Sequence, residues 1–241
     1  MNYYFLLEDE KSFIKVLPKW LGYMGFQCSR VVDIKAVTNH CYVMQSGQGV
    51  TRLIIKALYD TMDTILVNPG KINYLVIILD AEDELVNKRR REVYQKIEEY
   101  QLEKKIELEY EVRVFVCNHC FESWLLANES LYPLVEPEKE SFFYPYYAHY
   151  DISKNDPEFM MVPNEREETI AKYHFHYLHE LLRYKKIRYS KNKPQNIATK
   201  EYFKGMVERI EMTPHLKSFK AFHDFIMNHS QITNDRSKSE S

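Results

Sequence analysis

The apolar run at residues 74–79 constrains this chain most, because it ends directly in the acids Asp80, Glu82 and Asp83. An uninterrupted apolar run of this length is typical of a strand that is buried on both faces of a parallel sheet. Open α/β sheets bind ligands at the edge where such strands end. Neighbouring carboxylates repel one another unless they are solvated or hold a divalent cation, so the junction predicts a Mg²⁺ or Mn²⁺ site. A simple acidic turn is the alternative, because Asp is common in turns.

A second strand-like run, at residues 3–7, also ends in acids, at Glu8, Asp9 and Glu10. The apolar residues that follow repeat at helical spacing, which places these acids at a strand-to-helix turn. Some of them would serve only to favour a helix N-terminus, which attracts negative charge. If the two strands are neighbours in one sheet, Glu8 and Asp80 converge on the same edge.

Strands and helices alternate along the first half of the chain. We expect strands at 2–8, at 28–33 or 41–46, at 73–80 and at 110–117, and helices at 11–24, 50–67, 84–105 and 119–129. This order predicts an α/β fold with a mostly parallel sheet flanked by helices. We expect a core at 1–130, an aromatic-rich insertion or lid at 131–163, a helical C-terminal region at 164–230 and a disordered tail at 231–241.

The segment from Phe142 to Tyr150 is dense with rings. Exposed rings could form a lid or a platform on which unpaired bases stack. The simpler interpretation is a loop that packs on the core, on a partner or on a second copy of the chain. His174, His176 and His179 lie in a helical stretch that is also rich in aromatic residues, and we interpret them as ordinary packed or surface histidines.

Composition fits a cytoplasmic globular protein. The chain has 241 residues, 45% hydrophobic residues and a formal net charge of −2, so only local patches could attract nucleic acid. No apolar run approaches the length of a membrane span, and no signal peptide is apparent. The four cysteines indicate reduced thiols. Cys117 and Cys120 form a Cys-x-x-Cys, which we interpret as two buried structural residues.

Two basic segments, 88–91 and 183–193, are candidates for contacting phosphates. The second mixes cations with tyrosines, which suits nucleic acid better, although either segment could be an ordinary solvated surface. The predicted nucleic-acid contacts are Arg89, Arg90, Arg183, Lys185, Lys186, Arg188 and Lys191.

The acidic pattern resembles the Toprim domain, which occurs in topoisomerases, bacterial primases and OLD-type nucleases. The likeness consists of Glu8 after the first strand and the acids from Asp80 after a later one. The segment 114–126, Val-Phe-Val-Cys-Asn-His-Cys-Phe-Glu-Ser-Trp-Leu-Leu, is similar to a signature of RloB-like Toprim proteins, which are associated with bacterial phage-defence loci. Ser-Gly-Gln-Gly at 46–49 resembles the glycine turn of related proteins. The likeness covers roughly residues 1–130.

Three positions depart from the Toprim pattern. Asp9 stands where glycine is usual, Glu82 replaces the second aspartate of an Asp-x-Asp pair, and His119 replaces a proline. Glutamate can ligate Mg²⁺, so the pattern remains compatible with catalysis. The departures also leave open a domain that binds without cutting.

The resemblance implies a nuclease that hydrolyses phosphodiester bonds of DNA or RNA, tRNA included, in antiviral defence, with Mg²⁺ or Mn²⁺ as cofactor and an ABC-type ATPase as partner. The implied catalytic residues are Glu8, Asp80, Glu82 and Glu122, and the implied metal ligands are Glu8, Asp80, Glu82 and Asp83. Two alternatives remain: a non-catalytic module that senses nucleic acid or a phage protein and regulates an effector, and a phosphoryl-transfer enzyme with a nucleotide substrate. The chain carries no Gly-x-x-x-x-Gly-Lys-Ser/Thr loop for ATP.

Overall fold

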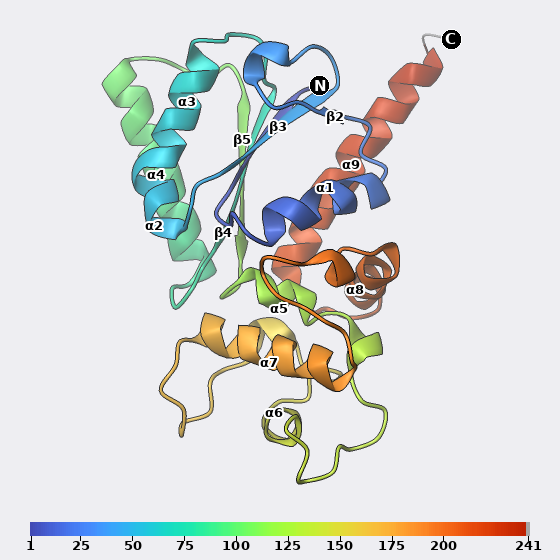
Figure 1. The fold of residues 1–241 in the computed structure, drawn as a ribbon. Helices are drawn as coiled ribbons and strands as arrows, with labels where there is room; N and C mark the ends of the chain where they lie inside the picture. Colours follow the sequence, from blue (N-terminus) through green and yellow to red (C-terminus); the bar gives the residue numbers. More distant parts are fainter. Residues whose placement is uncertain (240–241) are drawn as a thin grey trace.

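A five-stranded, all-parallel sheet forms the centre of the protein, whose computed structural model describes residues 1–239 (Figure 1). The strand order is β2-β3-β1-β4-β5. This arrangement confirms the predicted α/β class. The sequence predicted a strand at 28–33 or at 41–46, and the structure has a strand in each of these two segments. The strands are β1 (Tyr3–Leu7), β2 (Ser29–Arg30), β3 (Cys41–Ser46), β4 (Tyr74–Asp80) and β5 (Glu111–Cys117).

Strand β1 lies between β3 and β4, and its register decides where the acids meet. Leu7 pairs with Ile78 of β4, and the Glu8 amide continues the ladder by donating to the Ile78 carbonyl at 2.9 Å. Asp80 pairs with Cys117 at the end of β5. Parallel neighbours bring their carboxyl ends to one edge, so Glu8 and Asp80 lie side by side, as predicted.

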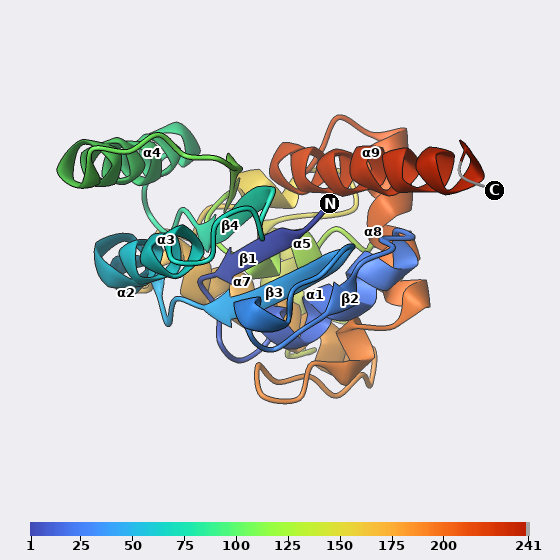
Figure 2. The ribbon, with the colours of Figure 1, turned by 90° about the horizontal axis from the view of Figure 1, so that it is seen from above.

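Helices cover both faces of the sheet (Figures 1 and 2). Tyr4 and Leu6 point to the face covered by the helical stretch α2–η2–α3 and by α4, whereas Tyr3, Phe5 and Leu7 point to α1 and α9. This alternation follows from the period of two along a strand. The helices are α1 (Phe13–Tyr23), α2 (Val50–Arg52), η2 (Leu53–Ala57), α3 (Leu58–Leu66), α4 (Val86–Lys104) and α9 (Lys217–Ser239).

A third group of elements lies beyond the carboxyl ends of the strands, below the sheet in Figure 1. It contains most of the segment between β5 and α9. Its elements are α5 (Phe121–Leu125), η3 (Glu129–Leu131), α6 (Tyr144–His149), η4 (Pro157–Phe159), α7 (Ile170–Tyr184), η5 (Gln195–Ile197) and α8 (Lys200–Met212). Phe143 and Tyr146 of the aromatic segment are buried against the rings of Tyr173 and Tyr177 on α7. The packed-loop interpretation is therefore confirmed for these rings.

Three boundaries differ from the sequence-based expectation. The helix expected at 119–129 ends at Leu125. In the region expected to be helical from 164, the first helix, α7, begins at Ile170, where the Thr169 side chain caps it by accepting the Lys172 amide. Helix α9 continues to Ser239, whereas the sequence predicted a disordered tail from residue 231; residues 240–241 lie outside the described residues. Within 1–239, no helix has both the length and the apolar character needed to cross a membrane.

Candidate active site

Glu8 and Asp80 are joined directly at the carboxyl edge of the sheet. The Asp80 backbone amide donates to Glu8 Oε2 at 2.7 Å. The Glu8 backbone is fixed in turn by the glycine turn after β3, because the Gly49 amide donates to the Glu8 carbonyl at 3.0 Å. Glycine is required in this turn: Gly49 has φ +101°, and a Cβ on Gly47 would lie 2.7 Å from Leu53 Cβ. The turn singled out in the sequence therefore positions Glu8.

Glu122 brings a third carboxylate to the same edge. It lies in the first turn of α5, directly beyond the end of β5, and only 2% of its surface is exposed. Burial raises the pKa of Asp80 well above its usual value, and the negative charges of Glu8 and Glu122 raise it further. Burial also raises the pKa of Glu8 to about 7, against the lowering effect of the Asp80 amide. Like charges therefore converge in a poorly solvated place.

One ammonium group partly neutralises these carboxylates. Lys191, in the loop after α7, places its Nζ 3.0 Å from Glu122 Oε1. Its positive charge also lowers the pKa values of Asp80 and Glu8, although burial outweighs this effect on both carboxyls. Sequence analysis predicted a phosphate contact for Lys191, and the structure instead shows it turned towards the carboxylates.

The remaining predicted acids have other surroundings. Glu82 is exposed, with an Arg89 nitrogen 3.8 Å from its carboxylate, although its charge still acts on Glu8. Asp83 is exposed. Asp9 accepts the backbone amides of residues 11, 12 and 13, so it caps the N-terminus of α1, as the simple alternative for the first acidic cluster proposes.

Backbone hydrogen bonds join the turns that follow β4 and β5. The Glu82 amide donates to the His119 carbonyl at 2.7 Å, and His119 Nδ1 donates back to the Glu82 carbonyl at 3.1 Å. Both residues have left-handed backbones, with φ of 56° and 64°. Conformations of this kind need support from their surroundings, which the paired hydrogen bonds supply. The usual proline could not adopt the backbone of His119.

The predicted four-ligand metal site is not assembled. Among residues 1–239, no group of three or more His, Cys, Asp or Glu side chains is placed to hold a metal ion. The donor chemistry nevertheless suits Mg²⁺ or Mn²⁺, since Glu8, Asp80 and Glu122 offer hard carboxylate oxygens. The hydroxyl oxygen of Tyr189 is buried without a hydrogen bond from the described residues, and the buried Glu122 Oε1 has the Lys191 ammonium 3.0 Å away without a well-oriented hydrogen bond. The candidate donors are therefore the carboxylates of Glu8, Asp80 and Glu122, without Asp83, although their present placement does not form a metal site.

The predicted basic residues divide into two groups. Arg89 lies near the acids, but its side chain is only 12% exposed and is 2.7 Å from the carboxylate of Glu92. It is therefore not available to contact phosphates. Arg90 is half-buried. The second segment is more open: Arg183, Lys186 and Arg188 line a groove of about 480 Å³ together with His179, Ile187 and Tyr189. Lys185, in the same segment, is half-buried.

The three histidines of α7 contact different partners. His174 is buried, with Nε2 donating to the Met160 carbonyl at 2.7 Å and Nδ1 lying 2.9 Å from Ser123 Oγ. His176 lies 2.8 Å from Glu168, and His179 lies 3.0 Å from Glu180. They therefore act as separate packed or surface residues. Cys117 and Cys120 are buried free thiols, as interpreted from the sequence.

Sequence analysis missed Tyr189, whose hydroxyl is buried close enough to Glu122 for that charge to raise its pKa, after burial itself. The signal in the sequence was that Tyr189 lies within the basic segment 183–193. We interpreted such a tyrosine as a ring on which a base could stack, and not as a residue beside the carboxylates.

The fold and this site define a class: a parallel α/β protein with converging carboxylates at the carboxyl edge of its sheet. No family model matches the chain, and comparison with curated proteins and with solved structures found no match.

Proposed function

We propose that this chain is a Mg²⁺- or Mn²⁺-dependent nuclease of the Toprim type, which hydrolyses phosphodiester bonds of DNA or RNA. The observation that carries the proposal is the convergence of Glu8, Asp80 and Glu122 from three separate elements on one edge. Burying like charges is unfavourable, so a cluster of this kind is retained where a cation or a reaction needs it. The resemblance of residues 1–130 to Toprim proteins supports the same reading.

In this proposal, each residue of the site has a separate role in catalysis. Asp80 and Glu122 would hold the cation, and Glu8 would be a further ligand or would accept a proton from the attacking water, since its pKa of about 7 suits a general base. A bound divalent cation would neutralise the scissile phosphate and lower the pKa of a water molecule. The groove lined by Arg183, Lys186 and Arg188 would bind the flanking phosphates.

The biological setting rests on the resemblance alone. We propose an anti-phage role in the cytoplasm, with DNA, RNA or tRNA as target and an ABC-type ATPase as controlling partner. Phe142, which is 44% exposed on the aromatic segment, would belong to a docking surface for that partner or for a second copy.

A second candidate is a non-catalytic sensor with the same fold. The Lys191–Glu122 ion pair favours it, because an ammonium at the carboxylates could replace a metal permanently. Metal binding distinguishes the two functions: a sensor of this kind would bind neither Mg²⁺ nor Mn²⁺ at the carboxylates.

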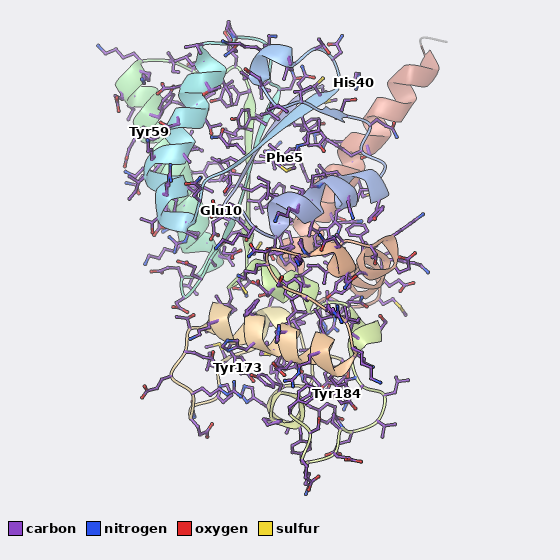
Figure 3. The ribbon with its side chains drawn as sticks, in the orientation of Figure 1. Phe5, Glu10, His40, Tyr59, Tyr173 and Tyr184 are labelled. Atoms are coloured by element: carbon purple, nitrogen blue, oxygen red, sulfur yellow. The ribbon has the colours of Figure 1, made fainter. Side chains whose placement is uncertain are left out.

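The test is a cleavage assay with plasmid, single-stranded DNA and total tRNA, each with Mg²⁺, with Mn²⁺ and with EDTA. We expect metal-dependent cleavage of at least one substrate and a loss of roughly 1,000-fold in rate for Asp80→Asn, the range typical of removing a group that stabilises transition-state charge. Glu10→Gln is the matched control, because Glu10 is exposed near the same edge (Figure 3). Equal cleavage by wild type and a folded Asp80→Asn protein would exclude the proposed mechanism.

A further inference from the structure

The Lys191 ammonium is held between acidic and aromatic groups. It lies 3.0 Å from Glu122 Oε1 and 5.3 Å from the centre of the Phe175 ring. Its side chain is 42% exposed, whereas that of Glu122 is 2% exposed. Burial is the largest single effect on the pKa of Lys191 and lowers it. The charge and hydrogen bond of Glu122, together with the charges of Cys120 and Asp80, raise the pKa more in sum, so the ammonium stays charged. The cation therefore reaches the carboxylates from the solvent side.

The turn that carries Lys191, residues 189–193, is joined to the rest of the protein by few contacts. Ser190 and Lys193 form an isolated antiparallel bridge, which makes a tight turn around Lys191. The Asn192 carbonyl accepts the Lys15 ammonium of α1 at 3.0 Å, and this contact is exposed. Tyr189 is buried, but its hydroxyl has no hydrogen-bond partner among the described residues. Further along the chain, Ile197 and Ala198 are buried in the core, and the Tyr23 hydroxyl donates to the Ala198 carbonyl at 3.0 Å. The part of the loop that can open at small energetic cost is therefore the turn 189–193.

An ammonium and a divalent cation would compete for the same oxygens. Glu122 Oε1 receives no well-oriented hydrogen bond from residues 1–239, and the Lys191 charge is the neutralising group that lies closest to it. The charge also acts on Asp80 and Glu8, so Lys191 serves the whole cluster. A divalent ion bound by these carboxylates would repel an ammonium 3.0 Å from one of them.

We propose that the turn 189–193 is a latch, in which the Lys191 ammonium takes the place of the divalent cation until a metal ion displaces it and releases the turn. This inference rests on the proposed metal site and adds its regulation. The closed form explains why three carboxylates converge without an assembled metal site. Release of this segment would turn Lys191 and its basic neighbours outwards, where they could contact a phosphate backbone. Metal binding and access of nucleic acid would thus be coupled.

The first experiment measures Mn²⁺ affinity by calorimetry in wild type and in Lys191→Met, which keeps the length of the side chain but removes its charge. We expect Lys191→Met to bind Mn²⁺ about tenfold more tightly, because no ammonium has to be displaced. Lys193→Met is the matched control on the same turn, since Lys193 is exposed, and its affinity should equal that of wild type. Thermal unfolding verifies that each variant is folded.

The second experiment follows the turn itself. Chymotrypsin cleaves after Tyr189 only when this buried ring becomes exposed, and mass spectrometry identifies the product. In wild type we expect Mn²⁺ to accelerate this cleavage at least fivefold, whereas Lys191→Met should be cleaved rapidly with or without metal.

The outcomes separate the two proposals. If neither protein binds Mn²⁺, both the metal site and the latch are wrong. If both bind it with equal affinity, or if Mn²⁺ leaves cleavage after Tyr189 unchanged, the metal site stands and the latch is wrong. Weaker binding by Lys191→Met would also overturn the latch, because it would make Lys191 a support for the metal rather than a competitor.

Discussion

The protein contains two groups of carboxylates, buried or half-buried, that differ in how they are satisfied. One is the edge cluster of Glu8, Asp80 and Glu122. The other is the pair Asp156 and Glu158, which lies around η4 and the start of α9. Both groups combine burial with negative charge, but hydrogen bonds saturate only the second.

Asp156 and Glu158 anchor the N-terminus of α9. Asp156 accepts the Leu216 amide at 3.1 Å, and Glu158 accepts the Ser218 amide at 3.2 Å and the Ser218 hydroxyl. The first amides of a helix have no partner within it, so these carboxylates meet a need of the fold. In the edge cluster, by contrast, Glu122 Oε1 lies beside one ammonium without a well-oriented hydrogen bond from the described residues. The saturated group is structural, whereas the unsaturated one has capacity left for a ligand.

The largest effect should come from the structural group. Glu158→Ala should lower the free energy of unfolding by roughly 3 kcal/mol, because it removes charged hydrogen bonds and leaves a buried amide unpaired. Urea unfolding followed by circular dichroism measures this, with the exposed Glu140→Ala as control. A loss below about 0.5 kcal/mol would remove the basis of the comparison.

A buried histidine next to the structural group gives a pH test. Burial lowers the pKa of His174 to about 4 from 6.5, so the unfolded chain takes up this proton at higher pH than the folded one. Stability from His174 is therefore present above pH 6.5 and decreases as the pH falls from 6.5 to 4, by up to about 3 kcal/mol.

Glu8 and Glu158, whose pKa values are both raised to about 7, change the stability in the opposite direction. Their folded forms bind the proton more tightly, so their contribution to the free energy of unfolding increases as the pH falls from 7 to 4.5. The measurement is therefore the difference in unfolding free energy between wild type and His174→Gln across this range. A difference that does not change with pH would contradict the buried neutral histidine.

Glu122→Gln should reduce metal-dependent cleavage roughly 100-fold, which corresponds to about 2.7 kcal/mol, because an amide holds a cation more weakly than a carboxylate. Glu158→Gln is the structural counterpart and should retain the rate of wild type at temperatures where it is folded. Single-turnover rates on the cleaved substrate decide between them. If Glu122→Gln and Glu158→Gln lost the same fraction of the cleavage rate, the edge cluster would have no functional role that the structural pair lacks.

The smallest effect is a gain in stability. Without metal at pH 8, Asp80→Asn should raise the free energy of unfolding by about 1 kcal/mol, since it removes a half-buried charge that repels Glu8 and Glu122. Thermal unfolding with EDTA measures the change. Destabilisation by Asp80→Asn would mean that the edge cluster, like the Asp156 pair, supports the fold.

The sequence predicted the elements whose signals are local. The apolar runs of β1 and β4 are uninterrupted, and a parallel sheet then obliges Glu8 and Asp80 to end at one edge. The position of Lys191 could not be predicted, because it depends on how a loop after α7 returns across the sheet edge to Glu122, far away in the sequence. Helical spacing also gave no indication that Arg89 would turn back to the turn after β4 and pair with Glu82.

The hydrogen bonds between Glu82 and His119 have a mechanical consequence. They connect the turn that leads out of Asp80 to the turn that leads into Glu122, so these two carboxylates belong to one stiff unit. Glu8 is hydrogen-bonded to β4 through its amide and its carboxylate and to the glycine turn through its carbonyl, so any tightening around a cation would require β1 to shift against β4. The spacing of the site would accordingly be set by the packing of β1 against β4 rather than by the flexibility of individual side chains.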